Sequence, residues 1–291
     1  MSRFLAQSLL WAALWSGAFI ATKFALLDND PFSIVAIRCI GAGLPIVCFS
    51  WRKILSTRLR HFFGISFIGV LNNVGYLGLM AVSLPNLSTN TATIMTSSIP
   101  LVILVISAIS GSKLNYIQWI GCIIGFLGMS TSTLFRLEYG DTSPKGIFIG
   151  LVAVGCLVLG TLLTPKLIPS GCPWTLTGIQ STCGGIVCAL IALTTEGVPK
   201  LNTTSITSFL FLIMGASLVG MTLWLKLIKN FGANKASMAH FLPPIFGIFF
   251  GNAFFNEPIS PAGSLLCIVG IIGLLMALKP SHHEKKSNTL L

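Results

Sequence analysis

Ten long apolar stretches, separated by short polar connections, account for most of the chain. The stretches are 4–27, 32–51, 62–82, 90–110, 117–135, 146–164, 175–193, 206–228, 234–255 and 260–278. Each is close to the ~20 apolar residues that a helix needs to cross the ~30 Å hydrocarbon core of a bilayer. The pattern therefore predicts an all-α integral membrane protein of ten transmembrane helices.

The composition agrees with this interpretation and leaves no room for a soluble catalytic domain. Hydrophobic residues make up 54% of the 291 residues and charged residues only 9%, with a mean hydropathy of +0.88. A soluble domain has about 25% charged residues. The 8 cysteines form no Cys-x-x-Cys pair and fall almost entirely inside apolar stretches, which is typical of small packing residues. We expect no cofactor and no metal site.

The net charge of +11 follows the topology and does not gather on one face. If the N-terminus is cytoplasmic, 13 of the 18 Lys and Arg residues fall in cytoplasmic segments and 3 in outer loops. Short loops rich in Lys and Arg stay on the cytoplasmic side. We therefore expect a multi-pass protein of the cell (inner or plasma) membrane with both termini in the cytoplasm. Its partners would be membrane lipid and a small molecule, with no nucleic acid and no obligate protein partner.

The two halves of the chain repeat each other. Four residues recur at a constant offset of 144, as the pairs Asn86/Asn230, Asn90/Asn234, Ala92/Ala236 and Pro100/Pro244. An odd number of spans per repeat forces the second copy to insert upside down, and inverted repeats place a transporter's binding site near the midplane. We predict a first five-helix repeat at 1–140, an inverted second repeat at 141–280, a central cavity between them, and a cytoplasmic tail at 281–291.

Several short motifs stand at the same relative places in the spans as in a known family. They are Leu10-Trp11 with Lys23, Pro31 to Arg38, Ser97-Ser98-Ile99-Pro100-Leu101, Gln118-Trp119-Ile120-Gly121 and Asn256-Glu257-Pro258-Ile259. With them the chain resembles the drug/metabolite transporter superfamily, specifically tandem EamA-type domains. The resemblance implies a ten-helix carrier with a central cavity, often exporting amino acids or related metabolites. The family's Gly-Glu-Arg/Lys-Leu after the fourth span reads Gly111-Ser112-Lys113-Leu114 here, so Glu257 has no counterpart in the first copy.

Arg38 is the charged residue placed deepest in a predicted span. It follows Pro31 by seven residues, roughly 10 Å below the outer surface at ~1.5 Å per residue. A charge at that depth is costly, so it should face the interior and have a partner. Arg38 would either hold a substrate carboxylate or phosphate, or tie helix ends together through backbone carbonyls. Lys23 lies nearer the end of its helix, where its long side chain can reach the interface.

Polar side chains inside the spans are further candidates for substrate binding. Asn72 and Tyr76 lie one turn apart on the third span, and Gln180 occupies the position of Arg38 in the second repeat. Amides at membrane depth need partners, either on a neighbouring helix or on a substrate.

The fourth and ninth spans present a pair of repeat-related polar faces. The fourth carries Thr93 and Ser97, and the ninth carries Ser237 and His240. Convergence of two such faces from inverted halves favours a cavity lining, although Ser and Thr also serve as simple helix-packing contacts.

Buried aromatic residues and prolines complete the candidate set. Trp15 lies too deep for an interfacial belt and should pack in the core or line the cavity, whereas Trp224 could instead anchor at the interface. Pro100, Pro243 and Pro244 interrupt helix hydrogen bonding and would act either as hinges for alternating access or as static kinks.

The sequence predicts a secondary transporter for a small anionic or zwitterionic metabolite, an amino acid or related compound, that is exported or exchanged by alternating access. No carboxylate lies deep in a predicted span, which disfavours proton/multidrug antiport, and Arg38 and Lys23 suit an anion better. An intramembrane enzyme would need paired acid/base groups or metal ligands in the spans, and the spans hold none. The closer alternative is a flippase or carrier for a lipid-linked or hydrophobic substrate.

Overall fold

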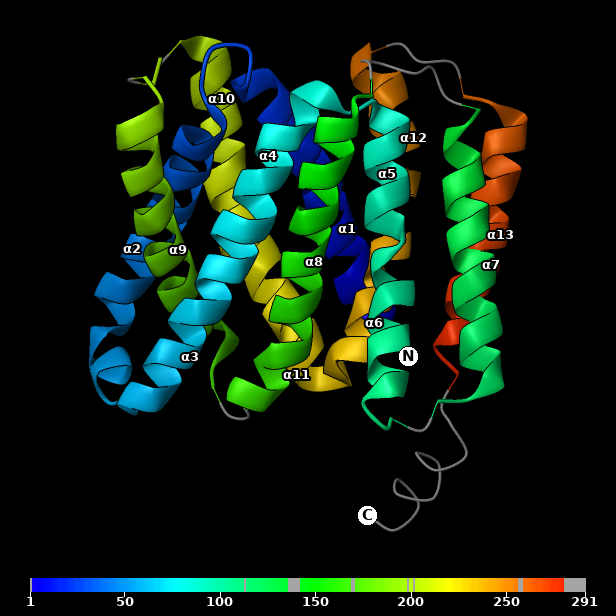
Figure 1. Cartoon of the computed structure of the whole chain (residues 1–291), viewed down its shortest axis with the longest axis horizontal. Coiled ribbons are helices and arrows are strands. Elements are labelled where there is room, and N and C mark those ends of the chain that lie inside the picture. Colours follow the sequence, from blue (N-terminus) through cyan, green and yellow to red (C-terminus); the bar gives the residue numbers. More distant parts are fainter. Residues whose placement is uncertain are drawn as a thin grey trace.

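The computed structural model of the chain describes residues 2–112, 114–135, 142–168, 171–197, 199–200, 202–255 and 259–279. The predicted tail at 281–291, and Lys113 and Glu257 of the motifs quoted above, lie outside the described residues. Within those ranges the chain is built from helices and contains no strand. The helices stand side by side (Figure 1).

The elements of the first half are α1 (Ser2–Ala25), α2 (Pro31–Leu55), α3 (Leu59–Gly69), η1 (Val70–Gly78), α4 (Leu79–Ser83), η2 (Leu84–Asn86), α5 (Thr89–Ser97), α6 (Ile99–Ile109) and α7 (Tyr116–Thr133). Those of the second half are α8 (Pro144–Leu167), α9 (Pro173–Thr195), α10 (Thr203–Phe211), η3 (Leu212–Gly220), α11 (Met221–Ser237), η4 (Met238–Phe241), α12 (Pro243–Phe255) and α13 (Pro261–Ala277). α3, η1, α4 and η2 form one continuous run.

Seven of these helical runs are long and apolar enough to cross a membrane, and α13 is a shorter apolar helix. One of the seven, Thr203–Ala253, has 51 residues, which is more than twice the ~20 that one span needs. The left-handed backbone of Gly232 (φ 78°) breaks it. α7 is not among the seven. It has 18 residues and ends in Ser and Thr, which lowers its mean hydropathy. The structure confirms an all-helical membrane fold, and the number of ten spans stays a prediction.

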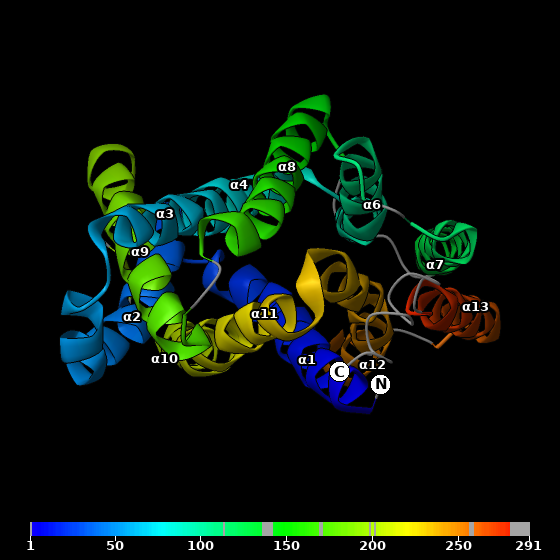
Figure 2. The same cartoon turned by 90° about the horizontal axis from the view of Figure 1, so that it is seen from below.

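Helices from the two halves pack on one another in an exchange-symmetric pattern. α2 packs along α9, and α7 packs along α13. α1 contacts α10, η3 and α11, while α8 correspondingly contacts α3, η1 and α4. In Figure 2 the α7/α13 pair lies at one end of the molecule and the α2/α9 pair at the other. Exchanging the halves leaves this contact pattern unchanged, as two copies related by a pseudo-two-fold axis require.

Each half carries a nine-residue π-helical segment, η1 (Val70–Gly78) in the first and η3 (Leu212–Gly220) in the second. The two lie at matching places, 142 residues apart. π-helical turns are rare and are found preferentially at functional sites. Here they hold Asn72, Tyr76 and Ser217, which belong to the site described below.

Bare glycine backbone lets α7 and α13 approach each other closely. A side chain at Gly273 would contact the backbone nitrogen of Gly125, and one at Gly128 would lie 2.6 Å from the backbone nitrogen of Gly270. These two contacts are exchanged by the same symmetry, since Gly125 and Gly128 correspond to Gly270 and Gly273 in sequence. Small residues at helix crossings allow close van der Waals packing in membranes, where the hydrophobic effect between helices is absent.

A clasp of hydrogen bonds joins the α1–α2 connection to the segment after α9. The Glu196 carboxylate accepts from the backbone N–H groups of Phe32 (2.8 Å) and Ser33 (2.7 Å), which caps the N-terminus of α2. Asn202 Nδ2 donates to Asp28 Oδ2 (2.7 Å), and the Lys200 N–H donates to the Asn29 side chain (2.8 Å). The described acidic residues are therefore used at helix ends and connections.

We expect Glu196→Ala to lower the free energy of unfolding by about 1 kcal/mol, because two N–H groups at a helix N-terminus lose a charged acceptor. Thermal unfolding in detergent measures the change. Thr195→Ala is the matched control, since the Thr195 hydroxyl donates only to Ile191 of its own helix (2.9 Å). Equal melting temperatures for the Glu196 variant and the wild type would contradict a structural clasp.

Candidate functional site

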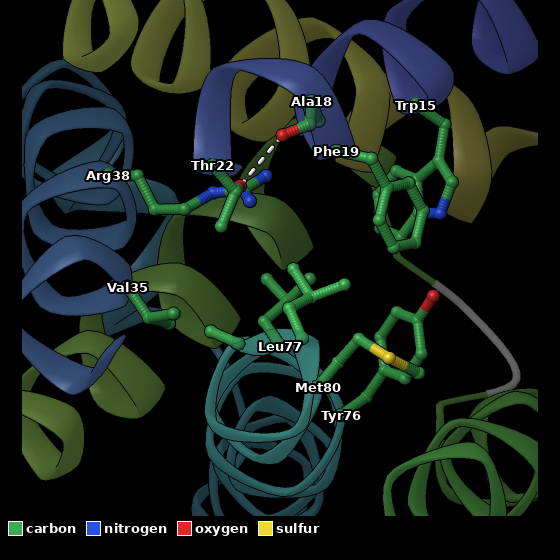
Figure 3. A pocket seen from close by; sticks show the side chains of 11 residues that line it. Trp15, Ala18, Phe19, Thr22, Val35, Arg38, Tyr76, Leu77 and Met80 are labelled. Atoms are coloured by element: carbon green, nitrogen blue, oxygen red, sulfur yellow. Dashed lines mark hydrogen bonds between the residues drawn. The ribbon is translucent and has the colours of Figure 1, made fainter. Parts of the chain in front are cut away.

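Arg38 lies buried in α2 with 4% of its surface exposed. Its Nε donates to Ser217 Oγ of η3 at 2.9 Å, and the rest of the guanidinium reaches toward Thr22 on α1 (Figure 3). Among the described residues no carboxylate pairs with it, because Asp28, Asp30 and Glu196 are engaged in the clasp. A buried cation without a counter-ion is expensive, so this charge is available for an anionic ligand.

A partly open cavity lies in front of Arg38, and the empty space within and around it is about 400 Å³. It lies between α1, α2 and the η1–α4 segment, as Figure 3 shows. The lining consists of Trp15, Ala18, Phe19, Thr22, Val35, Arg38, Tyr76, Leu77, Met80, Ala81 and Leu84. Apart from Arg38, the lining offers only hydroxyl and indole N–H groups as polar partners. The Thr22 hydroxyl is already donating to the Ala18 carbonyl (2.7 Å).

The rings of Trp11, Trp224 and His240 lie on the other side of Trp15 and Tyr76, and the five rings form one cluster. Trp11 stacks on Trp15 (ring centroids 5.2 Å apart) and on Trp224 (5.1 Å). His240 packs edge-on against Trp11 (4.8 Å) and Trp224 (4.9 Å). Trp15 and Tyr76 are parallel to within 4°, with ring centroids 6.0 Å apart. They line both the Arg38 cavity and a second, smaller cavity next to the ring cluster.

The polar atoms of this cluster are buried and lack hydrogen-bond partners. They are the indole Nε1 atoms of Trp11, Trp15 and Trp224, together with Tyr76 Oη, Asn72 Oδ1 and His240 Nε2. Tyr76 Oη and Trp15 Nε1 face each other and interact, but not at hydrogen-bonding geometry. Buried polar groups are almost always hydrogen-bonded in folded proteins, so a concentration of unpaired ones indicates a place for water or ligand.

The tautomer of His240 follows from its surroundings. Its Nδ1 lies 3.1 Å from the backbone carbonyl of Ser237, which can only accept a hydrogen bond. Nδ1 therefore carries the proton, and Nε2 of the neutral ring presents an acceptor lone pair toward the cavity.

An amide bracket holds η1 against α9 at the back of the site. Asn73 Nδ2 donates to the backbone oxygen of Gln180 (2.8 Å), and Asn72 Nδ2 donates to Gln180 Oε1 (3.3 Å). A side chain at Gly69 would lie 2.6 Å from the backbone oxygen of Gln180, which shows how closely the two backbones approach. Gln180 thus orients Asn72, which lines the smaller cavity and whose Oδ1 lies against Gly160 without a hydrogen-bond partner.

The two cavities together bring six of the predicted site residues into one place. These are Trp15, Arg38, Asn72, Tyr76, Trp224 and His240, with Gln180 bonded to Asn72 behind them. Trp224 is 2% exposed, so the alternative of an interfacial anchor is wrong for the described structure. Lys23 is half-buried and lines neither cavity.

Three predicted residues of the fourth and ninth spans line neither cavity. Thr93 is half-buried on α5, and Ser97 is buried with an unpartnered hydroxyl. The Ser237 hydroxyl donates to the Asn234 carbonyl (2.7 Å), so Ser237 acts on the site only through its carbonyl, which orients His240. Of the residues predicted on these two polar faces, His240 alone lines one of the two cavities.

The predicted hinge prolines stand at helix breaks of matching position. Pro100 follows the break between α5 and α6, and Pro243 and Pro244 open α12 after η4. The carbonyl of Pro243 accepts a hydrogen bond from Ser16 of α1 (3.3 Å). Whether these breaks move stays a prediction.

Sequence reasoning missed Trp11, Thr22 and Ser217 as site residues. Trp11 carried a signal, since it lies one turn from Trp15 on the same face of α1. Thr22 and Ser217 carried none, because Ser and Thr are common in membrane helices as packing residues.

Comparison with known proteins places the chain in a family. The EamA-like transporter family matches it twice, at residues 4–134 and 144–279. The uncharacterized transporter YvbV of Bacillus subtilis (strain 168) is 24% identical over 270 residues, covering 90% of this chain and 87% of that protein. Protein PecM of Dickeya dadantii (strain 3937) is 24% identical over 277 residues, covering 91% and 87%.

A solved crystal structure shares the fold, with a TM-score of 0.75 over 94% of this chain and 95% of that chain, at 15% identity. Two family matches in tandem, over nearly the whole length, accord with the two-fold pattern of helix contacts described above. The chain belongs to the EamA-like transporter family and is a multi-span membrane transporter.

Proposed function

We propose that the protein is a secondary transporter for a small metabolite carrying a carboxylate or similar anionic group, and that Arg38 binds this group. The observation that carries the proposal is a buried guanidinium that faces a cavity and has Ser217 as its one hydrogen-bond partner among the described residues. An anion in that cavity would supply the negative charge that the described residues do not place beside Arg38. The named transporters among its relatives support a transport role.

Alternating access would proceed by rocking of the repeats 1–140 and 141–280 about the cavity, as in other carriers with inverted repeats. The two ends of α1 carry the contacts that would have to open in turn. At its start, Phe4 packs edge-on against Phe231 (5.1 Å), and beyond its end lies the Glu196 clasp. In this scheme the carrier exports or exchanges an amino acid or related metabolite across the cytoplasmic membrane, with both termini inside.

A panel of metabolites tested by thermal shift on the purified protein would test the proposal. We expect a small organic anion to raise the melting temperature by several degrees at about 100 Kd, which corresponds to ~2.7 kcal/mol of linkage. The shift should disappear in Arg38→Gln, which keeps polar atoms but removes the charge. Arg52→Gln is the matched control, because Arg52 is an exposed arginine on the same helix.

Two results would contradict the proposal. A shift of full size in a folded Arg38→Gln variant would make Arg38 a structural brace. A response confined to lipid-linked or hydrophobic compounds would favour the alternative of a flippase or lipid carrier.

A further inference from the structure

The residues around Arg38 distinguish two classes of ligand that the charge of Arg38 alone does not. These are zwitterionic amino acids and organic anions that lack an ammonium group. A zwitterionic amino acid carries an ammonium group one carbon from its carboxylate. If Arg38 binds the carboxylate, the ammonium therefore lies close to the positive charge of the guanidinium. Among the described lining residues of both cavities there is no carboxylate to receive it. An ammonium group enclosed there would be desolvated without compensation.

Among the described residues that line the two cavities, the one charged group is the Arg38 guanidinium, which can only donate hydrogen bonds. Arg38 and the indole N–H groups of Trp11, Trp15 and Trp224 donate, whereas the free acceptors are His240 Nε2, Asn72 Oδ1 and hydroxyl oxygens. His240 and Asn72 line only the smaller cavity, Tyr76 lines both, and the Thr22 hydroxyl lies in the lining of the Arg38 cavity. Next to Arg38 the described lining offers a charged donor and no charged acceptor, which favours an anionic oxygen over an ammonium group.

The walls on which the rest of a ligand would lie are flat and apolar. Trp15, Phe19 and Tyr76 present rings to the cavity in front of Arg38, with Leu77 and Met80 beside them (Figure 3). Aromatic side chains favour aromatic partners by about 0.5–1.5 kcal/mol beyond the burial of area, through offset stacking or edge-to-face contacts. A planar conjugated body therefore fits this wall better than a branched aliphatic one.

We propose that the substrate is an aromatic organic anion that lacks an ammonium group, with its carboxylate at Arg38 and its ring against Trp15, Phe19 and Tyr76. This rests on the proposed function and narrows it, because the proposed function leaves anionic and zwitterionic metabolites equal. In this proposal Trp15 and Tyr76 select the ring, and the absence of an acidic group among the described residues that line the cavities excludes amino acids.

Four probes that differ by one feature each would test this on the wild-type protein. They are 3-phenylpropanoate, phenylalanine, 2-phenylethylamine and 3-cyclohexylpropanoate, with dissociation constants measured by isothermal titration in detergent. We expect 3-phenylpropanoate to bind about tenfold or more tightly than phenylalanine, which is ~1.4 kcal/mol. It should also bind several-fold more tightly than the cyclohexyl compound, and 2-phenylethylamine should not bind. The preference for phenyl over cyclohexyl should disappear in Trp15→Leu and persist in Trp174→Leu, whose tryptophan is 38% exposed and lines neither cavity.

Each of the other outcomes would overturn a specific part of the proposal. Phenylalanine binding as tightly as 3-phenylpropanoate overturns the exclusion of amino acids and leaves the anion carrier intact. Equal affinities for the phenyl and cyclohexyl acids in the wild type overturn the selection of the ring. If other anions from the metabolite panel bind and lose their binding in Arg38→Gln, but no phenyl compound binds, this inference is overturned and the proposed function stands. No binding of any organic anion overturns the proposed function as well.

Discussion

The Arg38→Met variant is expected to be more stable than the wild type without ligand and unable to bind or transport the anion. Methionine keeps much of the apolar length of arginine while removing a buried charge that has no carboxylate partner among the described residues. Replacing buried charges by apolar residues of similar volume is often stabilising, here by about 1–3 kcal/mol. For a chain of this size that corresponds to a rise in melting temperature of roughly 3 °C or more.

Ser217→Ala should change stability in the opposite direction. It leaves the Arg38 charge in place and removes its hydrogen bond to Ser217 Oγ (2.9 Å), a charged bond worth about 1.5–3 kcal/mol. Thermal unfolding of both variants in the same detergent, with transport measured in proteoliposomes, gives the comparison. A structural brace would make both variants less stable than the wild type. That result would contradict the proposal that the Arg38 charge serves to bind a ligand.

The positions of the membrane helices could be predicted from the sequence because in lipid a helix must satisfy its own backbone and show apolar side chains outward. The predicted stretch at 32–51 corresponds to Pro31–Leu55, and that at 175–193 to Pro173–Thr195. Helix ends were less accurate, because α2 extends into the basic residues Arg52 and Lys53, whose long side chains can reach water. The π-helical segments could not be predicted, since their backbone shift leaves no mark in the hydrophobic pattern.

The site was predictable where a residue type is costly in a membrane. Arg38, Asn72 and His240 stand out in an apolar stretch, and the structure places all three beside the cavities. Ser97 and Ser237 were chosen because they lie on polar helix faces at repeat-related places, and neither lines either of the two cavities. Serine can satisfy its hydroxyl within its own helix, as Ser237 does with Asn234, so its presence in a span carries little information about a site.

The glycine contacts between α7 and α13 predict a large loss of stability from a single added methyl group. In Gly273→Ala the new Cβ would contact the Gly125 backbone nitrogen and lie 2.7 Å from the Gly121 carbonyl oxygen. Backbone atoms on a helix cannot rotate away, so the two helices must separate along their whole crossing, at a cost of about 1–3 kcal/mol or more.

The matched control is Gly155→Ala on α8, where an added Cβ meets nothing within 4 Å. Alanine has the higher helix propensity, so this control should be neutral or stabilised by up to about 1 kcal/mol. Because α7 and α13 form a pair at one end of the molecule (Figure 2), away from the Arg38 cavity, Gly273→Ala should lower the melting temperature while ligand affinity below that temperature changes little. Unchanged stability would mean that the pair can separate freely. An equal loss of affinity and stability would mean that this pair transmits motion to the cavity, as expected if the repeats rock as rigid units about their shared contacts.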